Sequence, residues 1–292
     1  MRFSLSFLIA FTVACSGAVD NSDKSATLAT GPRAVAAPDE VSIAYTVSGG
    51  GSPALVFIHG WMGDQTFWSA QVGAFESENT VVTIDLPGHG QSGMERDGWT
   101  LTAFGADVQT VVEYLDLTEV VLIGHSMGGP VALEAARLMP ERAIGVIAVD
   151  SLQDADAKYD PEQMKGRLAA FESDFVGTCV QFSTSMFLEG SDPALVERVT
   201  SDMCDGSPEI AIALLREFFG YEMGPALAAV GVPVRFLNAD MWPTNIEINR
   251  TYQPNFDGLV MEGAGHFLML EEPDSFNKLL KQIIANLDQP AL

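Results

Sequence analysis

The sequence is poor in cationic side chains, with 15 lysine and arginine residues against 39 aspartate and glutamate residues and a formal net charge of −24. Nucleic acid is excluded as a natural partner, because a phosphate backbone attracts basic surfaces. Docking on an anionic membrane by charge alone is disfavoured for the same reason. No cluster of potential ligands has the spacing of a metal site, and no internal repeat is visible. The composition is that of a globular protein, and 292 residues suffice for one large domain, or for one domain with an insertion.

Cysteines are also few, with three in the chain, and the first follows a segment typical of export. Residues 1–14 carry one cation, Arg2, and then an apolar run that is too short to span a bilayer but suits a signal peptide. TVAC (residues 12–15) resembles a bacterial lipobox, with threonine where leucine is usual. We therefore predict a cell-envelope lipoprotein, lipidated at Cys15 and facing the periplasm or the surface. Cleavage near Ala18, giving a soluble periplasmic or secreted protein, is the alternative.

Residues 15–38 are rich in serine, alanine, threonine and aspartate and lack periodicity, which predicts a flexible tether between the anchor and a folded domain. The other two cysteines, Cys179 and Cys204, follow much later in the chain. In an exported protein they could form a disulfide worth about 3 kcal/mol. Two unpaired buried thiols are the alternative.

From residue 39 onward, strand-like and helix-like patterns alternate. Short apolar runs suit strands that are covered on both faces of a parallel sheet, and one alternating run suits a half-exposed strand. The predicted strands are residues 41–47, 54–58, 81–84, 120–123, 144–149, 232–238 and 256–262. Apolar residues at helical spacing predict helices over 104–115, with Thr102 as the N-cap, and over 276–287, with Pro273 in the first turn.

The alternation breaks at residues 151–228, where helical patterns follow one another without a convincing strand. A helical block inserted into an alternating chain predicts a cap over the edge of the sheet. We therefore predict an α/β fold with a mostly parallel, doubly wound sheet. Residues 39–150 and 229–292 form its core, and residues 151–228 form an inserted helical cap. Ligands of such sheets collect at the carboxyl ends of the strands.

A serine between glycines stands at the end of one predicted strand. Residues 124–128, GHSMG, fit the G-x-S-x-G nucleophile elbow, in which a sharp turn projects the serine above the sheet. The apolar run 120–123 precedes the motif and the helix-compatible segment 130–139 follows it, as the elbow requires. Ser126 is therefore the candidate nucleophile, and a plain tight turn is the alternative.

Four motifs in this order resemble the α/β-hydrolase fold superfamily, in its capped branch of serine esterases and lipases. They are FIHGW (57–61), DLPGHGQS (85–92), the elbow and GAGH (263–266), and the likeness extends from about residue 40 to 287. The elbow serine needs a histidine as general base, and the order Ser…Asp…His points to His266. The remaining histidines, His59, His89 and His125, are assigned structural roles.

The acid that would orient His266 has two candidates. The family most often places it after the strand that precedes the last one, which here gives Asp240. In the family pattern, a glycine is followed by two variable residues and then by the aspartate. Here Asn238 stands in place of the glycine, and Asp240 comes one position earlier than the pattern requires. Asp150 ends strand 144–149, where some lipases carry the acid. We favour Asp240 and keep Asp150 as the alternative.

The resemblance also implies that the backbone N–H groups of Trp61 and Met127 form the oxyanion hole. The Trp61 side chain either lines the substrate pocket or packs in the interior. The cap is rich in large apolar side chains, most of which should form its own core, while the rest suggest a pocket for a small to medium apolar acyl group. These side chains are Phe171, Phe175, Phe182, Met186, Phe187, Phe218, Phe219 and Tyr221.

The function expected from these residues is cleavage of a carboxylic ester through an acyl-enzyme, on a small-molecule substrate and without a cofactor or metal. Serine at the elbow argues against the dehalogenase and epoxide-hydrolase branches, whose nucleophile is aspartate. A C–C bond hydrolase, a lactonase, an amidase or a cofactor-free haloperoxidase could use the same triad. A non-catalytic envelope binding protein on this fold is the alternative of another class, because fold does not imply activity. The physiological substrate and the oligomeric state do not follow from the sequence.

Overall fold

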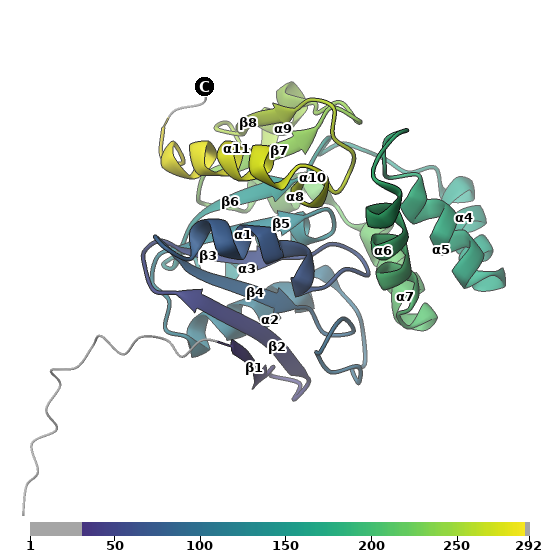
Figure 1. Ribbon diagram of the computed structural model, residues 1–292, viewed down its shortest axis with the longest axis horizontal. Coiled ribbons are helices and arrows are strands. Elements are labelled where there is room, and N and C mark those ends of the chain that lie inside the picture. Colours follow the sequence, from purple (N-terminus) through teal and green to yellow (C-terminus); the bar gives the residue numbers. More distant parts are fainter. Residues whose placement is uncertain (1–30, 290–292) are drawn as a thin grey trace, which may run out of the picture.

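The computed structural model describes residues 31–289. The predicted signal peptide, Cys15 and the tether before Gly31 lie outside the described residues. Within residues 31–289, no helix has both the length and the apolar character needed to cross a membrane. An eight-stranded sheet forms the centre of the molecule, with helices on both faces and a separate helical group at one end (Figure 1).

The sheet has the strand order β1-β2-β4-β3-β5-β6-β7-β8. Strands β1 and β2 are antiparallel to their neighbours, and from β4 to β8 all pairs are parallel. Every residue of β3, β4 and β5 is buried, as expected for a sheet covered on both faces. The strands are β1 (Gly31–Ala36), β2 (Ser42–Gly49), β3 (Ala54–Ile58), β4 (Thr80–Asp85), β5 (Val120–His125), β6 (Ala143–Val149), β7 (Val234–Ala239) and β8 (Asp257–Met261).

All seven predicted strands form, and the fold class predicted from the sequence is confirmed. The predicted tether is wrong at its end, because Gly31–Ala36 pairs along its whole length with β2. This strand pairs with the adjacent strand β2, and none of residues 32–36 is fully buried, so its sequence carries little of the apolar pattern that marks a strand.

Helices α1 (Ser69–Phe75) and α11 (Pro273–Ala285) cover one face of the sheet, while α2 (Leu101–Tyr114) and α3 (Gly128–Leu138) cover the other (Figure 1). Pro273 begins α11, as predicted. The predicted N-cap of α2 is wrong by two residues, because the Thr100 side chain accepts the hydrogen bond from the Ala103 N–H, at 3.1 Å. Shorter elements complete the core: η1 (Gln65–Trp68), α9 (Ile246–Tyr252) and α10 (Leu268–Glu271).

Between β6 and β7 the chain forms helices and no strand, as predicted. Three of the helices begin with a capping side chain followed by proline, at Asp160, Asp192 and Ser207, which is a strong local signal for a helix start. The five helices are α4 (Pro161–Ser173), α5 (Phe175–Thr184), α6 (Pro193–Cys204), α7 (Pro208–Gly220) and α8 (Met223–Ala228). Helices α4–α7 stand together beside the sheet (Figure 1), whereas α8 packs against α3 and α9 of the core.

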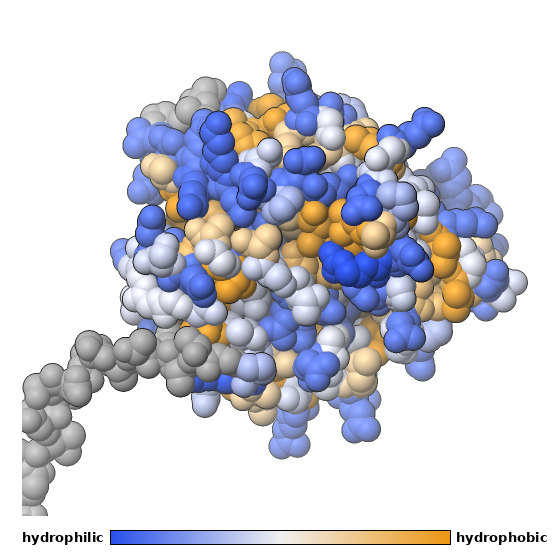
Figure 2. All heavy atoms as spheres, in the orientation of Figure 1, coloured by the Kyte–Doolittle hydropathy of each residue, from blue (hydrophilic) through white to orange (hydrophobic). Residues whose placement is uncertain are grey.

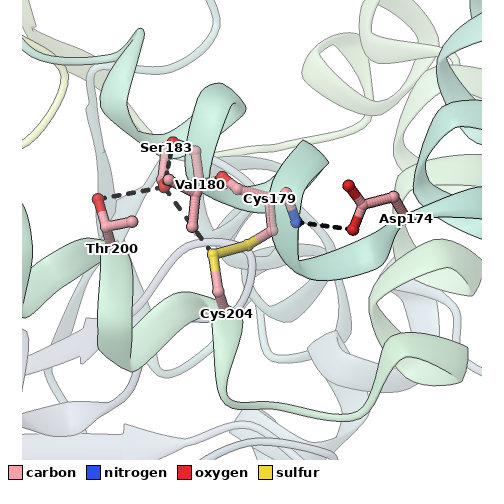
Figure 3. The surroundings of a disulfide bond; sticks show 7 residues. Asp174, Cys179, Val180, Ser183, Thr200 and Cys204 are labelled. Atoms are coloured by element: carbon pink, nitrogen blue, oxygen red, sulfur yellow. Dashed lines mark hydrogen bonds between the residues drawn. A yellow bond between two sulfur atoms is a disulfide. The ribbon is translucent and has the colours of Figure 1, made fainter.

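A disulfide joins Cys179 of α5 to Cys204 of α6 (Figure 3), so the paired alternative is the one found. The two Cα atoms are 5.7 Å apart. Beside the bond, the Ser183 hydroxyl donates to the Cys179 carbonyl oxygen at 2.8 Å, and its oxygen lies 3.2 Å from the Thr200 hydroxyl, which is placed to donate to it. The bond therefore fixes two helices of the cap to each other.

Candidate active site

Ser126 occupies the turn between β5 and α3 with a φ of 53°, in the left-handed region that non-glycine residues rarely adopt. The glycines on each side are required by close backbone contacts. A Cβ atom at Gly124 would lie 2.0 Å from the Gly128 carbonyl oxygen, and one at Gly128 would lie 2.6 Å from that of Ile58. The strand–turn–helix geometry of the predicted elbow therefore forms.

Hydrogen bonds hold the strained Ser126 backbone in place. Its N–H donates to the Val149 carbonyl oxygen of β6 at 2.9 Å. Its own carbonyl oxygen accepts from the Gly129 N–H at 2.9 Å and from the Ser151 hydroxyl at 2.7 Å. Two of these partners, Val149 and Ser151, come from β6 and the residues after it, so the end of β6 supports the elbow directly.

His266 lies in the loop after β8 and shares a buried hydrogen bond with Asp150. Its Nδ1 atom is 2.5 Å from Asp150 Oδ2, and both side chains are buried. The other carboxylate oxygen, Oδ1, accepts from the Ala239 N–H at 3.0 Å and from Gln153 Nε2 at 3.4 Å. Because a carboxylate only accepts hydrogen bonds, Nδ1 is the donor in this contact, and Nε2 is the ring nitrogen left for other partners.

The prediction that Asp240 orients His266 is wrong, and Asp150 takes that place. Asp240 is exposed, and its Oδ1 accepts from the Gly263 N–H at 3.0 Å, which caps the turn before the histidine loop. The Asp240 N–H still pairs with the Met261 carbonyl oxygen of β8, but β7 ends at Ala239 and Asp240 stands in the turn that follows. Its side chain bonds to the Gly263 backbone there and not to His266.

The other three histidines, for which the sequence predicts structural roles, are buried and contact backbone groups. The His59 ring donates to the Gly60 carbonyl oxygen at 2.8 Å and accepts from the Leu86 N–H at 2.9 Å. His89 contacts a backbone carbonyl oxygen at 3.1 Å, and His125 contacts that of His266 at 2.9 Å. Burial lowers the pKa of His59 to about 4 and that of His89 to about 3, and it lowers the pKa of His125 well below the usual value. All three rings are therefore neutral at neutral pH.

Two backbone donors adjoin the elbow serine. A Cβ atom at Gly60 would lie 3.0 Å from the Ser126 Cβ, so the loop after β3 reaches Ser126 because residue 60 has no side chain. Trp61 follows in that loop, and Met127 follows Ser126. Among the backbone hydrogen bonds of residues 31–289, none is donated by the N–H of Trp61 or Met127. Both groups are thus available to an oxygen atom placed above Ser126.

The Trp61 side chain combines the two roles left open by the sequence. Its indole lines the pocket above Ser126, and the ring Nε1 donates to the Ala211 carbonyl oxygen of α7 at 2.9 Å. The same ring packs edge-on against Phe171 and Phe182 of the cap, with centroids 5.7 and 5.6 Å away. Trp61 therefore connects the core loop to the cap.

An apolar pocket opens over Ser126 and His266, with an empty volume of about 510 Å³ that includes its mouth. No lysine, arginine, aspartate or glutamate lines it. The lining residues are Gly60, Trp61, Gly63, Phe67, His125, Ser126, Met127, Phe182, Met186, Met203, Leu215, Phe218, Phe219, His266 and Phe267. On the face drawn in Figure 2, hydrophobic side chains gather where the cap meets the core, with further hydrophobic patches among the hydrophilic side chains elsewhere on this face.

Half of the eight cap side chains singled out in the sequence line this pocket: Phe182, Met186, Phe218 and Phe219. The other four lie elsewhere, among them Tyr221, whose hydroxyl donates to Glu134 at 2.6 Å. Met203 and Leu215 were not predicted. The helical spacing of Leu215 with Phe218 and Phe219 is the signal that could have indicated it. Within the part of the chain that the structure describes, no group of three or more histidine, cysteine or carboxylate side chains could hold a metal ion.

Known proteins resemble the chain over most of its length. A dihydrolipoyllysine-residue acetyltransferase component of the acetoin cleaving system from Cupriavidus necator is 29% identical over an alignment of 260 residues, which covers 84% of this chain and 67% of that protein. A second such component, from Pseudomonas putida, is 27% identical, and this chain spans 64% of its length. A putative esterase/lipase from Haemophilus influenzae is 26% identical over 80% of this chain and 83% of that protein.

Solved structures share the fold. A thermophilic esterase from Thermogutta terrifontis matches with a TM-score of 0.75 at 23% identity, covering 88% of this chain and 99% of that one. A putative aryl esterase from Burkholderia cenocepacia matches with the same score and identity, over 87% and 98%. At this identity the likeness shows the fold alone. Residues 55–279, which hold the elbow and His266, match the Alpha/beta hydrolase family, and the chain therefore belongs to the alpha/beta hydrolase family.

Proposed function

We propose that the protein is a serine hydrolase that cleaves a carboxylic ester with an apolar acyl group. Ser126 is the nucleophile, His266 the general base and acid, and Asp150 the carboxylate that orients His266. One observation carries the proposal: the elbow serine shares a pocket with His266, whose Nδ1 is 2.5 Å from the buried Asp150 carboxylate. The esterase/lipase relative adds support for an ester as the substrate.

The reaction begins when Ser126 Oγ attacks the ester carbonyl carbon and its proton passes to His266 Nε2. Asp150 stabilises the imidazolium that results. The tetrahedral intermediate collapses by breaking the bond to the alcohol oxygen, which takes the proton from Nε2. Water then attacks the acyl-enzyme by the same route, releasing the acid and restoring the Ser126 hydroxyl.

The negative oxygen of each tetrahedral intermediate needs preorganised donors. In this proposal the N–H groups of Trp61 and Met127 supply them, each worth about 3 kcal/mol of the barrier. Their freedom from other acceptors supports the assignment, because a donor already paired would be unavailable to the intermediate. The absence of charged side chains from the pocket lining favours a neutral acyl group, since an ionised one would lose its hydration without gaining a partner.

A fluorophosphonate probe tests the proposal. We expect stoichiometric modification of Ser126 in the wild type and none in Ser126→Ala, with both proteins shown to be folded by circular dichroism. A parallel screen of acyl esters, lactones and amides should give the highest kcat/KM on an ester. A folded wild type that is neither labelled nor active would refute the proposal and favour a non-catalytic binding protein.

A further inference from the structure

Helix α7 presents one face to the pocket above Ser126. Leu215, Phe218 and Phe219 line this pocket, and their spacing places them on the same side of a helix. Phe219 is the last residue before Gly220, at which α7 ends, and its side chain is partly buried. The wall of the pocket on this side is therefore made by the end of a helix.

A second space, here called the outer groove, lies on the cap with an empty volume of about 1020 Å³ that includes open solvent. It is lined mainly by apolar surface, with Lys165, Glu172 and Arg216 among its residues. The lining residues are Tyr159, Pro161, Met164, Lys165, Leu168, Ala169, Glu172, Arg216, Phe219 and Gly220. Of the residues that line the pocket and the outer groove, Phe219 alone belongs to both. Its side chain thus stands between the two spaces.

Two side chains from outside α7 brace Phe219, in addition to its neighbour Phe218, whose ring centroid is 6.0 Å away. The Arg167 guanidinium carbon is 5.6 Å from the centroid of the Phe219 ring and also 5.6 Å from that of Phe182, another pocket residue. The Tyr159 ring packs on Phe219 with centroids 4.9 Å apart. Arg167 and Tyr159 are both exposed. Cation–π and aromatic contacts of this kind favour one position of the ring.

We propose that Phe219 sets the upper limit on the length of the acyl chain that the enzyme accepts. The inference rests on the proposed function, because the chain must start at the carbonyl carbon held over Ser126. A chain that fills the pocket meets the Phe219 ring. Without the ring, the pocket would continue into the outer groove, where further methylene groups would leave water for the apolar side chains of Met164 and Leu168.

The experiment compares kcat/KM for soluble p-nitrophenyl butyrate, octanoate and decanoate, each below its aggregation concentration. Burying one methylene group changes an equilibrium constant about fourfold. If two additional methylene groups reach the outer groove, the decanoate-to-butyrate ratio should rise about fifteenfold in Phe219→Ala. Phe219→Leu should give a smaller rise, and Phe219→Trp should lower the ratio.

Two control variants test whether a change in the decanoate-to-butyrate ratio comes from the position of the Phe219 ring or from the loss of any aromatic side chain. Phe218→Ala enlarges the pocket without joining it to the outer groove, because Phe218 lines only the pocket. Phe175→Ala removes a cap phenylalanine that lines neither space and packs on Phe171 at 6.0 Å. Neither should raise the ratio as Phe219→Ala does. Melting curves confirm that each variant is folded.

The results separate the two proposals. The wild type, Phe219→Ala and Phe219→Trp could all hydrolyse the esters with the same dependence of kcat/KM on acyl-chain length. That result would overturn the length limit and leave the proposed function standing. An equal rise in Phe218→Ala would also overturn it. If a folded wild type neither hydrolyses any ester nor reacts with a fluorophosphonate, both proposals fall.

Discussion

Replacing Asp150 by asparagine changes one atom of the side chain and removes the charge that faces His266. Both carboxylate oxygens accept hydrogen bonds in the native protein, Oδ2 from His266 and Oδ1 from the Ala239 N–H. Asparagine offers one oxygen and one NH₂ group. The Ala239 N–H is a fixed donor and retains the oxygen, so the NH₂ group is turned toward His266 Nδ1.

An NH₂ group at that position forces the His266 ring into its other tautomer. Nδ1 must then accept a hydrogen bond, and the ring proton moves to Nε2, where it blocks removal of the Ser126 proton. The loss of the base and of the stabilised imidazolium should lower kcat about 10⁴-fold, equivalent to about 5.5 kcal/mol of barrier. Asp240→Asn is the matched control, because an amide oxygen can still accept from the Gly263 N–H. Its rate should stay within about twofold of the wild type, as for an ordinary surface substitution.

The assay is the steady-state hydrolysis of p-nitrophenyl butyrate by the wild type and both variants, with melting curves to confirm folding. Active-site titration with a fluorophosphonate gives the concentration of competent enzyme. A large loss in Asp240→Asn together with a nearly normal rate in Asp150→Asn would refute the assignment of Asp150. It would mean that the hydrogen bond to His266 does not hold the base during the reaction.

Two further predictions concern stability. The Cys179–Cys204 disulfide joins residues 25 apart in sequence. A closed loop of that size restricts the unfolded chain, so replacing both cysteines by serine should lower the free energy of unfolding, measured by urea titration, by about 3.5 kcal/mol. A change below about 1 kcal/mol would contradict the assumption that the bond stabilises the protein by lowering the entropy of the unfolded chain. Burial lowers the pKa of His89 to about 3, below that of the unfolded chain, so the unfolded state binds a proton that the native state does not. Stability from this residue is therefore present above about pH 6.5 and is lost as the pH falls toward 3, by about 1.4 kcal/mol per pH unit. Between about pH 6 and pH 4, the free energy of unfolding of His89→Asn should depend less steeply on pH than that of the wild type, by the equivalent of one proton. An unchanged slope would show that His89 is charged in the native protein.

The sheet could be predicted because its central strands are continuous apolar runs. This pattern is local, so it can be recognised in the sequence without knowing which distant residues it contacts. The elbow could also be predicted from the sequence, because Gly124, Ser126 and Gly128 lie within five consecutive residues and together form the turn. His266 could be named because few histidines are present and one of them follows the last strand. These elements depend on residues that are neighbours in the chain.

The acid could not be chosen in this way. Asp150 and Asp240 both end strands that lie side by side in the sheet, where Val149 pairs with Leu237. Both aspartates stand one residue beyond their strands, Asp150 with a left-handed φ of 42° and Asp240 in a turn. Which carboxylate reaches His266 therefore depends on the shape of each turn, which the sequence pattern does not specify. The same limit applies to Met203, because the face that a cap helix turns toward the pocket is set by its packing and not by its own sequence.

The hydrogen bond from the Trp61 indole to Ala211 affects how the enzyme can be redesigned. Trp61 belongs to the loop that carries one proposed oxyanion donor, and Ala211 belongs to the cap. The two parts are thus not interchangeable modules. A minimal hydrolase made by deleting the cap, or a chimera carrying a foreign one, would leave that indole without its acceptor, so any graft should supply a carbonyl oxygen at the same position.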